Sequence, residues 1–216
     1  MSPSLRFVGY RGSGKTSFIV SAVTYINKQK GYHVKFPEKG LLGSIKALRE
    51  FNNERLKFLK GGENAQAELS TKSEKYFNIE IRKGFLSKDT TRILFYDIPG
   101  GETEEMELIF KDYISNPDTI TIGIINAEKY ERPFNANDKE NRTNNVVIDL
   151  IKNAEAGVII LSHVDRVSYG RVGEIIEDIR KLGCTADKVP IYRVDNRVAE
   201  ESPINPGIVL MQILDI

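Results

Sequence analysis

The segment from Gly9 to Thr16 reads GYRGSGKT, and it constrains the fold of this chain more than any other feature. An apolar run precedes it, and the residues after it carry apolar side chains at helical spacing. Its glycines allow the backbone to curl, so that several N–H groups point at one anion at the positive end of a helix. We therefore expect a strand over about 5–9, a helix over about 15–30, and a phosphate-binding loop between them.

Each side chain of this loop has an expected role in binding a nucleotide. Lys15 reaches the β- and γ-phosphates, and the Thr16 hydroxyl binds Mg²⁺. The alternative is a glycine-rich turn without function, which the strand-loop-helix context disfavours. The residues expected to contact the nucleotide here are Gly12, Ser13, Gly14, Lys15, Thr16 and Ser17.

Composition sets the class of protein. The 216 residues, 40% hydrophobic and 28% charged, suit one globular domain over 1–216 with a sizeable core. The net charge of +1 gives no reason to expect nucleic acid bound by bulk electrostatics. We find neither an apolar run as long as a membrane span nor a signal peptide, and Cys184 is the single cysteine. These features favour a cytoplasmic protein.

The rest of the chain alternates between strand and helix patterns. Residues 31–74 form an extra segment, with a helix over about 41–60 followed by a polar loop. A strand around 77–82 and a second over 91–97 read as an antiparallel pair. Further strands are expected at 119–125, 157–161 and 189–194, and helices at 138–153, 171–182 and 208–214. This order predicts a three-layer α/β domain of the P-loop NTPase type, with a mostly parallel six-stranded sheet, one antiparallel edge strand and a helical insertion before the second strand.

Asp97-Ile98-Pro99-Gly100 follows an expected strand. A carboxylate there can hold Mg²⁺ through a water, and the Gly100 N–H can approach a γ-phosphate closely. That contact exists only with a triphosphate, which is how a nucleotide switch works. An ordinary strand-end turn is the alternative, and the upstream phosphate loop favours the functional interpretation.

Ser162-His163-Val164-Asp165 comes directly after a buried apolar strand. Here the chain resembles the GTP-binding branch of P-loop proteins, the Ras-like and translation-factor-like GTPases, whose base-recognition motif is N/T-K-x-D. The resemblance implies that Asp165 accepts hydrogen bonds from guanine, which adenine cannot supply. Ser162 and His163 depart from the pattern; the His163 ring could stack on the base in place of the family's lysine. A solvated turn is the alternative.

The resemblance extends to other positions with weaker matches. After the last strand, the backbone N–H of Asp195 or Asn196 would contact guanine O6, although an ordinary turn fits equally. The effector-loop threonine that binds Mg²⁺ would be Thr71, with Ser70 as second choice. The extra length before the second strand also occurs in divergent prokaryotic members of the class, so we expect a prokaryotic origin.

Catalysis departs from the family in one respect. Ras-like enzymes orient the attacking water with a glutamine just after the D-x-x-G motif, where this chain has Gly101. Glu102 could substitute, or could be a carboxylate at a helix N-terminus. Arg11, inside the phosphate loop, could reach the γ-phosphate as an arginine finger or point to solvent. The resemblance thus implies slow hydrolysis of GTP to GDP, completed by a protein partner, an activator or a second copy of the chain.

Three functions remain open from the sequence. The first is a guanine-nucleotide switch that uses Mg²⁺ and binds an effector. The second is a P-loop ATPase or small-molecule kinase, for which residues 131–145 would be a poor lid. The third is a non-catalytic module stabilised by nucleotide, consistent with Gly101 and the apolar tail.

Overall fold

The computed structural model describes residues 4–10, 12–37, 49, 52–53, 75–84, 90–97, 119–131, 139–195 and 202–215. In chain order the elements are β1 (Ser4–Val8), α1 (Lys15–Lys28), β2 (Tyr32–Lys35), β3 (Lys75–Lys83), β4 (Thr90–Asp97), β5 (Thr119–Asn126), α5 (Lys139–Asn153), β6 (Ala156–Ser162), the 3-10 turn η2 (Val164–Arg166), α6 (Tyr169–Lys181), β7 (Ile191–Arg193) and α7 (Pro206–Leu214).

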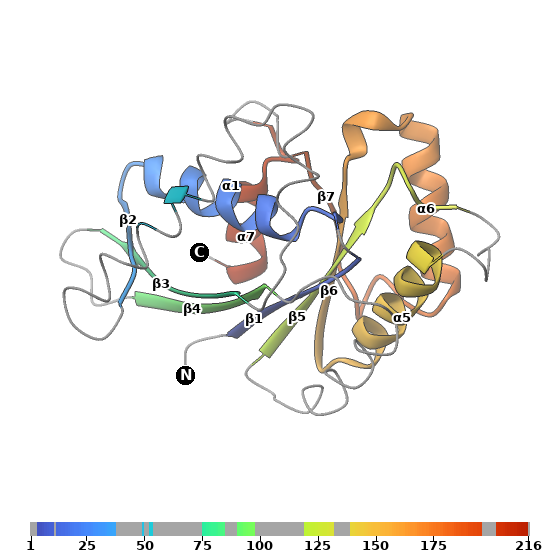
Figure 1. The fold of residues 1–216 in the computed structure, drawn as a ribbon, viewed down its shortest axis with the longest axis horizontal. Helices are drawn as coiled ribbons and strands as arrows, with labels where there is room; N and C mark the ends of the chain where they lie inside the picture. Colours follow the sequence, from blue (N-terminus) through green and yellow to red (C-terminus); the bar gives the residue numbers. More distant parts are fainter. Residues whose placement is uncertain are drawn as a thin grey trace.

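Within the described residues, seven strands form one sheet in the order β2-β3-β4-β1-β5-β6-β7 (Figure 1). Strands β4, β1, β5, β6 and β7 pair in parallel, whereas β3 is antiparallel to both of its neighbours. The first strand, β1, lies in the middle of the sheet, between β4 and β5. Its carboxyl end therefore lies at the centre of the row of carboxyl strand ends. Ligands of open α/β sheets bind beside this row.

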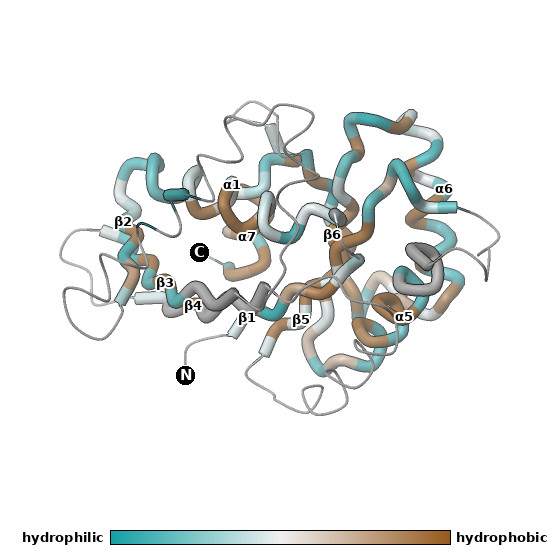
Figure 2. Tube along the Cα trace, viewed as in Figure 1, coloured by the Kyte–Doolittle hydropathy of each residue, from teal (hydrophilic) through white to brown (hydrophobic). Residues whose placement is uncertain are grey.

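Helices cover both faces of the sheet, which gives three layers. In Figure 1, α1 and α7 lie on one face and α5 and α6 on the other. The first core forms around α1, where Phe18, Ile19 and Ile26 face the strands, and the second forms around Val147, Ile151 and other apolar side chains of α5 and α6. Strand β6 is hydrophobic along most of its length (Figure 2), as expected of a strand covered on both sides.

Two glycines let α5 approach the sheet closely. A Cβ atom on Gly123 of β5 would lie 2.8 Å from Cγ1 of Val147 and 2.9 Å from Cγ1 of Ile151. A Cβ on Gly157 of β6 would collide with the Ile151 carbonyl. These contacts fix α5 against β5 and β6, whose carboxyl ends border the candidate site.

The sequence-based fold needs three corrections. The sheet has seven strands among the described residues rather than six, because β2 adds to it directly after α1. The antiparallel strand β3 is not the edge strand; β2 pairs with its outer side, from Tyr32 opposite Lys83 to Lys35 opposite Glu80. The segment after α1 therefore begins with a strand, whereas the expected helix at 41–60 lies almost wholly outside the described residues.

The other predicted elements are confirmed within a few residues of their expected bounds. They include the β3–β4 antiparallel pair, α5, α6, and the short closing helix, which is α7. In α7, Val209 and Leu210 are buried against the core around α1. No helix in the described ranges is both long and apolar enough to cross a membrane.

Candidate functional site

The loop between β1 and α1 has the backbone geometry of an anion-binding concavity. Gly12 and Gly14 have left-handed φ angles of +81° and +97°, which side chains disfavour. A Cβ on Gly9 would collide with the Ile124 carbonyl, so the start of the loop also requires glycine. Ser13 N donates to Tyr10 O over 3.1 Å and closes the turn. The loop is therefore shaped by its own sequence.

The Lys15 ammonium group folds back over this loop. Its Nζ donates to Gly9 O at 2.9 Å and to Tyr10 O at 3.2 Å, and the residue is 5% exposed. Thr16, beside it in the first turn of α1, is equally buried. A cation and a hydroxyl thus lie where a helix N-terminus already favours negative charge.

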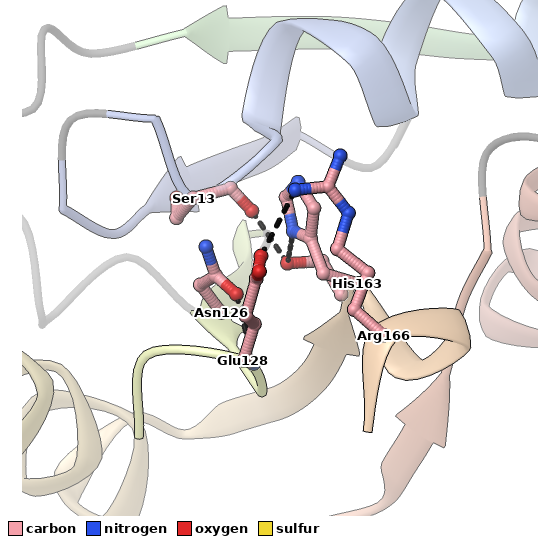
Figure 3. A network of polar contacts seen from close by, with 6 residues as sticks. Ser13, Asn126, Glu128, His163 and Arg166 are labelled. Atoms are coloured by element: carbon pink, nitrogen blue, oxygen red, sulfur yellow. Dashed lines mark hydrogen bonds and ion pairs between the residues drawn. The ribbon is translucent and has the colours of Figure 1, made fainter. Parts of the chain in front are cut away.

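The turn that follows β6 is tied to the phosphate loop by a buried serine. The hydroxyl of Ser162 donates to Ser13 O over 2.6 Å, beside His163 (Figure 3). Ile125 O lies farther from the same hydroxyl, at 3.3 Å. Nδ1 of His163 lies 3.0 Å from the same Oγ. Because a hydroxyl has a single proton, which serves the carbonyl, the Ser162 oxygen accepts from His163, and the hydrogen lies on Nδ1.

His163 packs on the phosphate loop from a strained backbone. Its φ of 56° is left-handed, a conformation that costs a non-glycine residue about 1 kcal/mol or more. Its Cε1 atom lies 3.6 Å from where a Cβ on Gly14 would be. The buried ring thus borders the loop, and Asp165 follows on η2 with its side chain exposed.

The carboxyl ends of four parallel strands, β4, β1, β5 and β6, bring the expected Asp97 and a further residue, Asn126, toward this place. Asp97 ends β4, and its backbone is in register with Phe7 of β1. Asn126 ends β5 in register with Ser162 of β6. Arg11, Ser70, Thr71, Gly100, Gly101, Glu102 and Asn196 lie outside the described residues.

After β7, the backbone N–H of Asp195 is engaged within the fold. It donates to Ile204 O over 3.1 Å, and Val194 N donates to Leu161 O over 2.8 Å. Asp195 itself is 8% exposed. Of the two amides expected to reach a base, that of Asp195 is therefore already used.

An ion pair beside the site has no counterpart in the sequence-based interpretation. Nη1 of Arg166, on η2, lies 3.0 Å from Oε2 of Glu128, in the loop after β5 (Figure 3). Glu128 N also donates to Asn126 Oδ1 over 3.0 Å. The two charges are 38 positions apart, and no local pattern links residues at that distance. Only the pairing of β5 with β6 indicates that they meet.

No protein-family model and no curated protein sequence matches this chain. Solved structures match it in fold. The GTPase-like domain of S. cerevisiae Ski7 aligns with TM-scores of 0.56 in its GTP-bound structure and 0.55 in that with GDP and inorganic phosphate, at 11% and 12% identity. A bacterial selenocysteine-specific elongation factor, EF-Sec, aligns with a TM-score of 0.52 at 14% identity.

The three alignments cover 99–100% of this chain, 49–50% of the Ski7 chains and 28% of EF-Sec. The chain thus spans half or less of the length of these proteins. At such low identity the likeness concerns the fold. The fold resembles that of these GTPase and GTPase-like domains.

Proposed function

We propose that this protein is a guanine-nucleotide-binding switch, which binds Mg²⁺-GTP and hydrolyses it slowly to GDP. The observation that carries the proposal is the buried hydrogen bond from Ser162 Oγ to Ser13 O. It joins the phosphate loop to the turn expected to recognise the base, across 149 positions of sequence. One molecule with a phosphate at one end and a base at the other would span these two elements.

The phosphates would bind to the loop between β1 and α1. The N–H groups of Gly12 and of residues 14–17 would supply hydrogen-bond donors, since that of Ser13 donates to Tyr10 O, and the helix end adds partial positive charge. The Lys15 ammonium, now on two loop carbonyls, would exchange these neutral acceptors for charged phosphate oxygens. Bonds between charged partners are the stronger ones.

The base would lie against η2. Asp165 is exposed and follows His163, whose ring already packs on Gly14. Its carboxylate would accept from the N1 and N2 hydrogens of guanine, and the His163 ring would border the base. The amide for guanine O6 would come from Asn196, since the Asp195 N–H donates to Ile204 O.

The residues expected to hold Mg²⁺ are Thr16, Asp97 and Thr71. Thr16 begins the helix after β1, and Asp97 ends the strand beside β1. Hydroxyl and carboxylate oxygens are the donors that Mg²⁺ prefers, so the residue types fit the ion. When bound, Mg²⁺ would neutralise charge between the β- and γ-phosphates, and the Gly100 N–H would sense the γ-phosphate.

Hydrolysis is proposed to be slow because Gly101 replaces the water-positioning glutamine. Arg11 within the phosphate loop and Glu102 after Gly101 are the side chains proposed to compensate. Completion of the site by a protein activator, an effector or a second copy of the chain is the remaining part of the proposal. Single-turnover phosphate release, with wild-type protein and Arg11→Ala, measures this part separately from binding.

Competition between nucleotides tests the binding proposal. Labelled GDP bound to the protein should be displaced by GTP and not by ATP at the same concentration. Asp165→Asn should weaken GDP binding, because the amide keeps one acceptor oxygen and replaces the other with an NH₂ donor that opposes a guanine N–H. Equal displacement by ATP would favour the alternative, a P-loop ATPase or kinase.

A further inference from the structure

The turn η2 has few internal constraints on its orientation. It is a single 3-10 turn, closed by one backbone bond from Arg166 N to His163 O of 3.1 Å. No side chain caps its start, none of its residues is buried, and the chain enters it through the left-handed His163. The direction of Asp165 therefore depends on contacts from outside the turn.

Val164 packs on the core around α5 and α6. The other contacts come from the loop after β5, residues 127–131, which we call the β5 loop. Ala127 N donates to Ser162 O over 2.9 Å, just before the turn. Glu128 pairs with Arg166 within the turn. Arg171 Nη2, in the first turn of α6, donates to the Tyr130 carbonyl over 2.8 Å. The β5 loop thus contacts the strand that precedes η2, η2 itself and the helix that follows it.

Glu128 is well placed to act on Arg166 because its own backbone is fixed. Its N–H donates to the Asn126 side chain, and Asn126 is in register with Ser162 across the β5–β6 pair. Figure 3 shows Glu128 and Arg166 pointing toward one another from the two loops. Their side chains are 40% and 26% exposed, so the pair lies at the surface of the site.

We propose that Glu128 is a positioning residue that sets base specificity through Arg166. Arg166 is the chain neighbour of Asp165 on the same turn, and its guanidinium is the nearest cation in sequence that could pair with that carboxylate. By engaging Arg166, Glu128 orients η2 and leaves the Asp165 carboxylate to accept from a base. This inference rests on the proposed function, since it assigns Asp165 to the base.

The size of the effect follows from the exposure of the pair. Partly exposed ion pairs contribute modestly, so removing this one should change affinity by about 2- to 5-fold rather than abolish binding. A general loss of stability would weaken the binding of two similar nucleotides equally. A mispositioned Asp165 would change the ratio of their affinities. GDP and inosine diphosphate form a suitable pair, because inosine lacks only the 2-amino group that Asp165 is proposed to read.

The experiment compares GDP and inosine diphosphate binding to wild-type protein and Glu128→Gln. The GDP preference should fall about 2- to 5-fold in Glu128→Gln, while the thermal midpoint falls by no more than it does in the control variant. Asp149→Asn is the matched control, because it removes a carboxylate from an exposed 2.8 Å ion pair with Lys152 on α5. It should leave the preference unchanged.

The double variant Glu128→Gln/Arg166→Gln tests the cause. If a released Arg166 neutralises Asp165, removing both charges restores part of the preference; a double variant no better than Glu128→Gln contradicts this. An unchanged ratio in Glu128→Gln, or an equal fall in Asp149→Asn, overturns the inference alone. A wild-type protein without any preference for GDP overturns the proposed function instead.

Discussion

Ser162 and Ser13 lie 149 positions apart in sequence, and the hydroxyl of the first donates to the carbonyl of the second over 2.6 Å. Both residues are almost completely buried. The bond makes the end of β6 and the loop after β1 one structural unit. The buried Ser162–Ser13 hydrogen bond thereby helps to determine where the exposed turn η2 lies relative to the loop after β1.

Ser162→Ala should destabilise the protein by about 1–3 kcal/mol, because it leaves the Ser13 carbonyl without this donor and His163 Nδ1 without its acceptor. Denaturant unfolding measures this change. Ser21→Ala is the control, since the Ser21 hydroxyl is buried and finds no partner among the described residues. Equal losses in the two variants would show that the Ser162 bond contributes nothing particular.

Gly9→Ala should cost more than about 2 kcal/mol, because the added Cβ collides with the Ile124 carbonyl in the sheet. Gly173→Ala, in the interior of α6 with open space around it, should instead stabilise by up to about 1 kcal/mol. Thermal or chemical unfolding of both variants checks the contrast. A Gly9→Ala protein as stable as wild type would mean that the loop does not pass so close to β5.

Lys15→Ala should reduce GDP affinity by about 100-fold or more, because a charged phosphate contact is lost at a water-poor site. The fold should remain, since the Lys15 ammonium donates to the Gly9 and Tyr10 carbonyls of the loop itself rather than to the core of the sheet. Titration calorimetry measures the affinity. Lys152→Ala, on the surface of α5, removes a lysine far along the chain from the loop and should leave it unchanged; similar losses in both would indicate non-specific electrostatics.

The pKa of the Cys184 thiol is raised, chiefly because burial disfavours the thiolate. The folded state therefore holds this proton more tightly than the unfolded state. The resulting stability is fully present below the unfolded pKa, near 8.5, and is lost as the pH rises toward the folded value. Between about pH 8 and 10 the unfolding free energy of wild type should fall more steeply than that of Cys184→Ala.

The slopes of unfolding free energy against pH are compared, rather than the free energies themselves, because Cys184→Ala also changes packing at all pH values. Cys184 is buried in the core around α5 and α6, and its Sγ contacts the Ile148 carbonyl at 3.8 Å. Parallel pH profiles for the two proteins would show that the thiol does not titrate differently on unfolding.

The elements with strong periodicity could be predicted from sequence, and those built by tertiary pairing could not. Residues 157–161 are continuously apolar and form β6, and the stripe at Val172, Ile175 and Ile179 forms the buried face of α6. Strand β2 is only four residues long, and its partner β3 begins after a long intervening segment. Its existence follows from that pairing rather than from its own pattern.

The candidate site divides in the same way. The left-handed backbone of the loop between β1 and α1, at Gly12 and Gly14, could be predicted because only glycine adopts it readily; its role in binding phosphate stays a prediction. The hydrogen bond from Asp195 N to Ile204 O could not, because it depends on how the chain returns to α7. The Glu128–Arg166 pair likewise requires β5 and β6 to be neighbours, which only the fold decides.

Displacement of labelled GDP by guanine and adenine nucleotides tests guanine recognition most directly. With Asp165 accepting from the base, GTP and GDP should compete at least about 100-fold more effectively than ATP and ADP, because adenine has no N1 or N2 hydrogen to offer this carboxylate and presents the N1 lone pair to it instead. The preference should largely disappear in Asp165→Asn, whereas Lys15→Ala should weaken all four nucleotides together. Displacement of GDP by an equal concentration of ADP would contradict the assignment of this protein as a guanine-nucleotide switch.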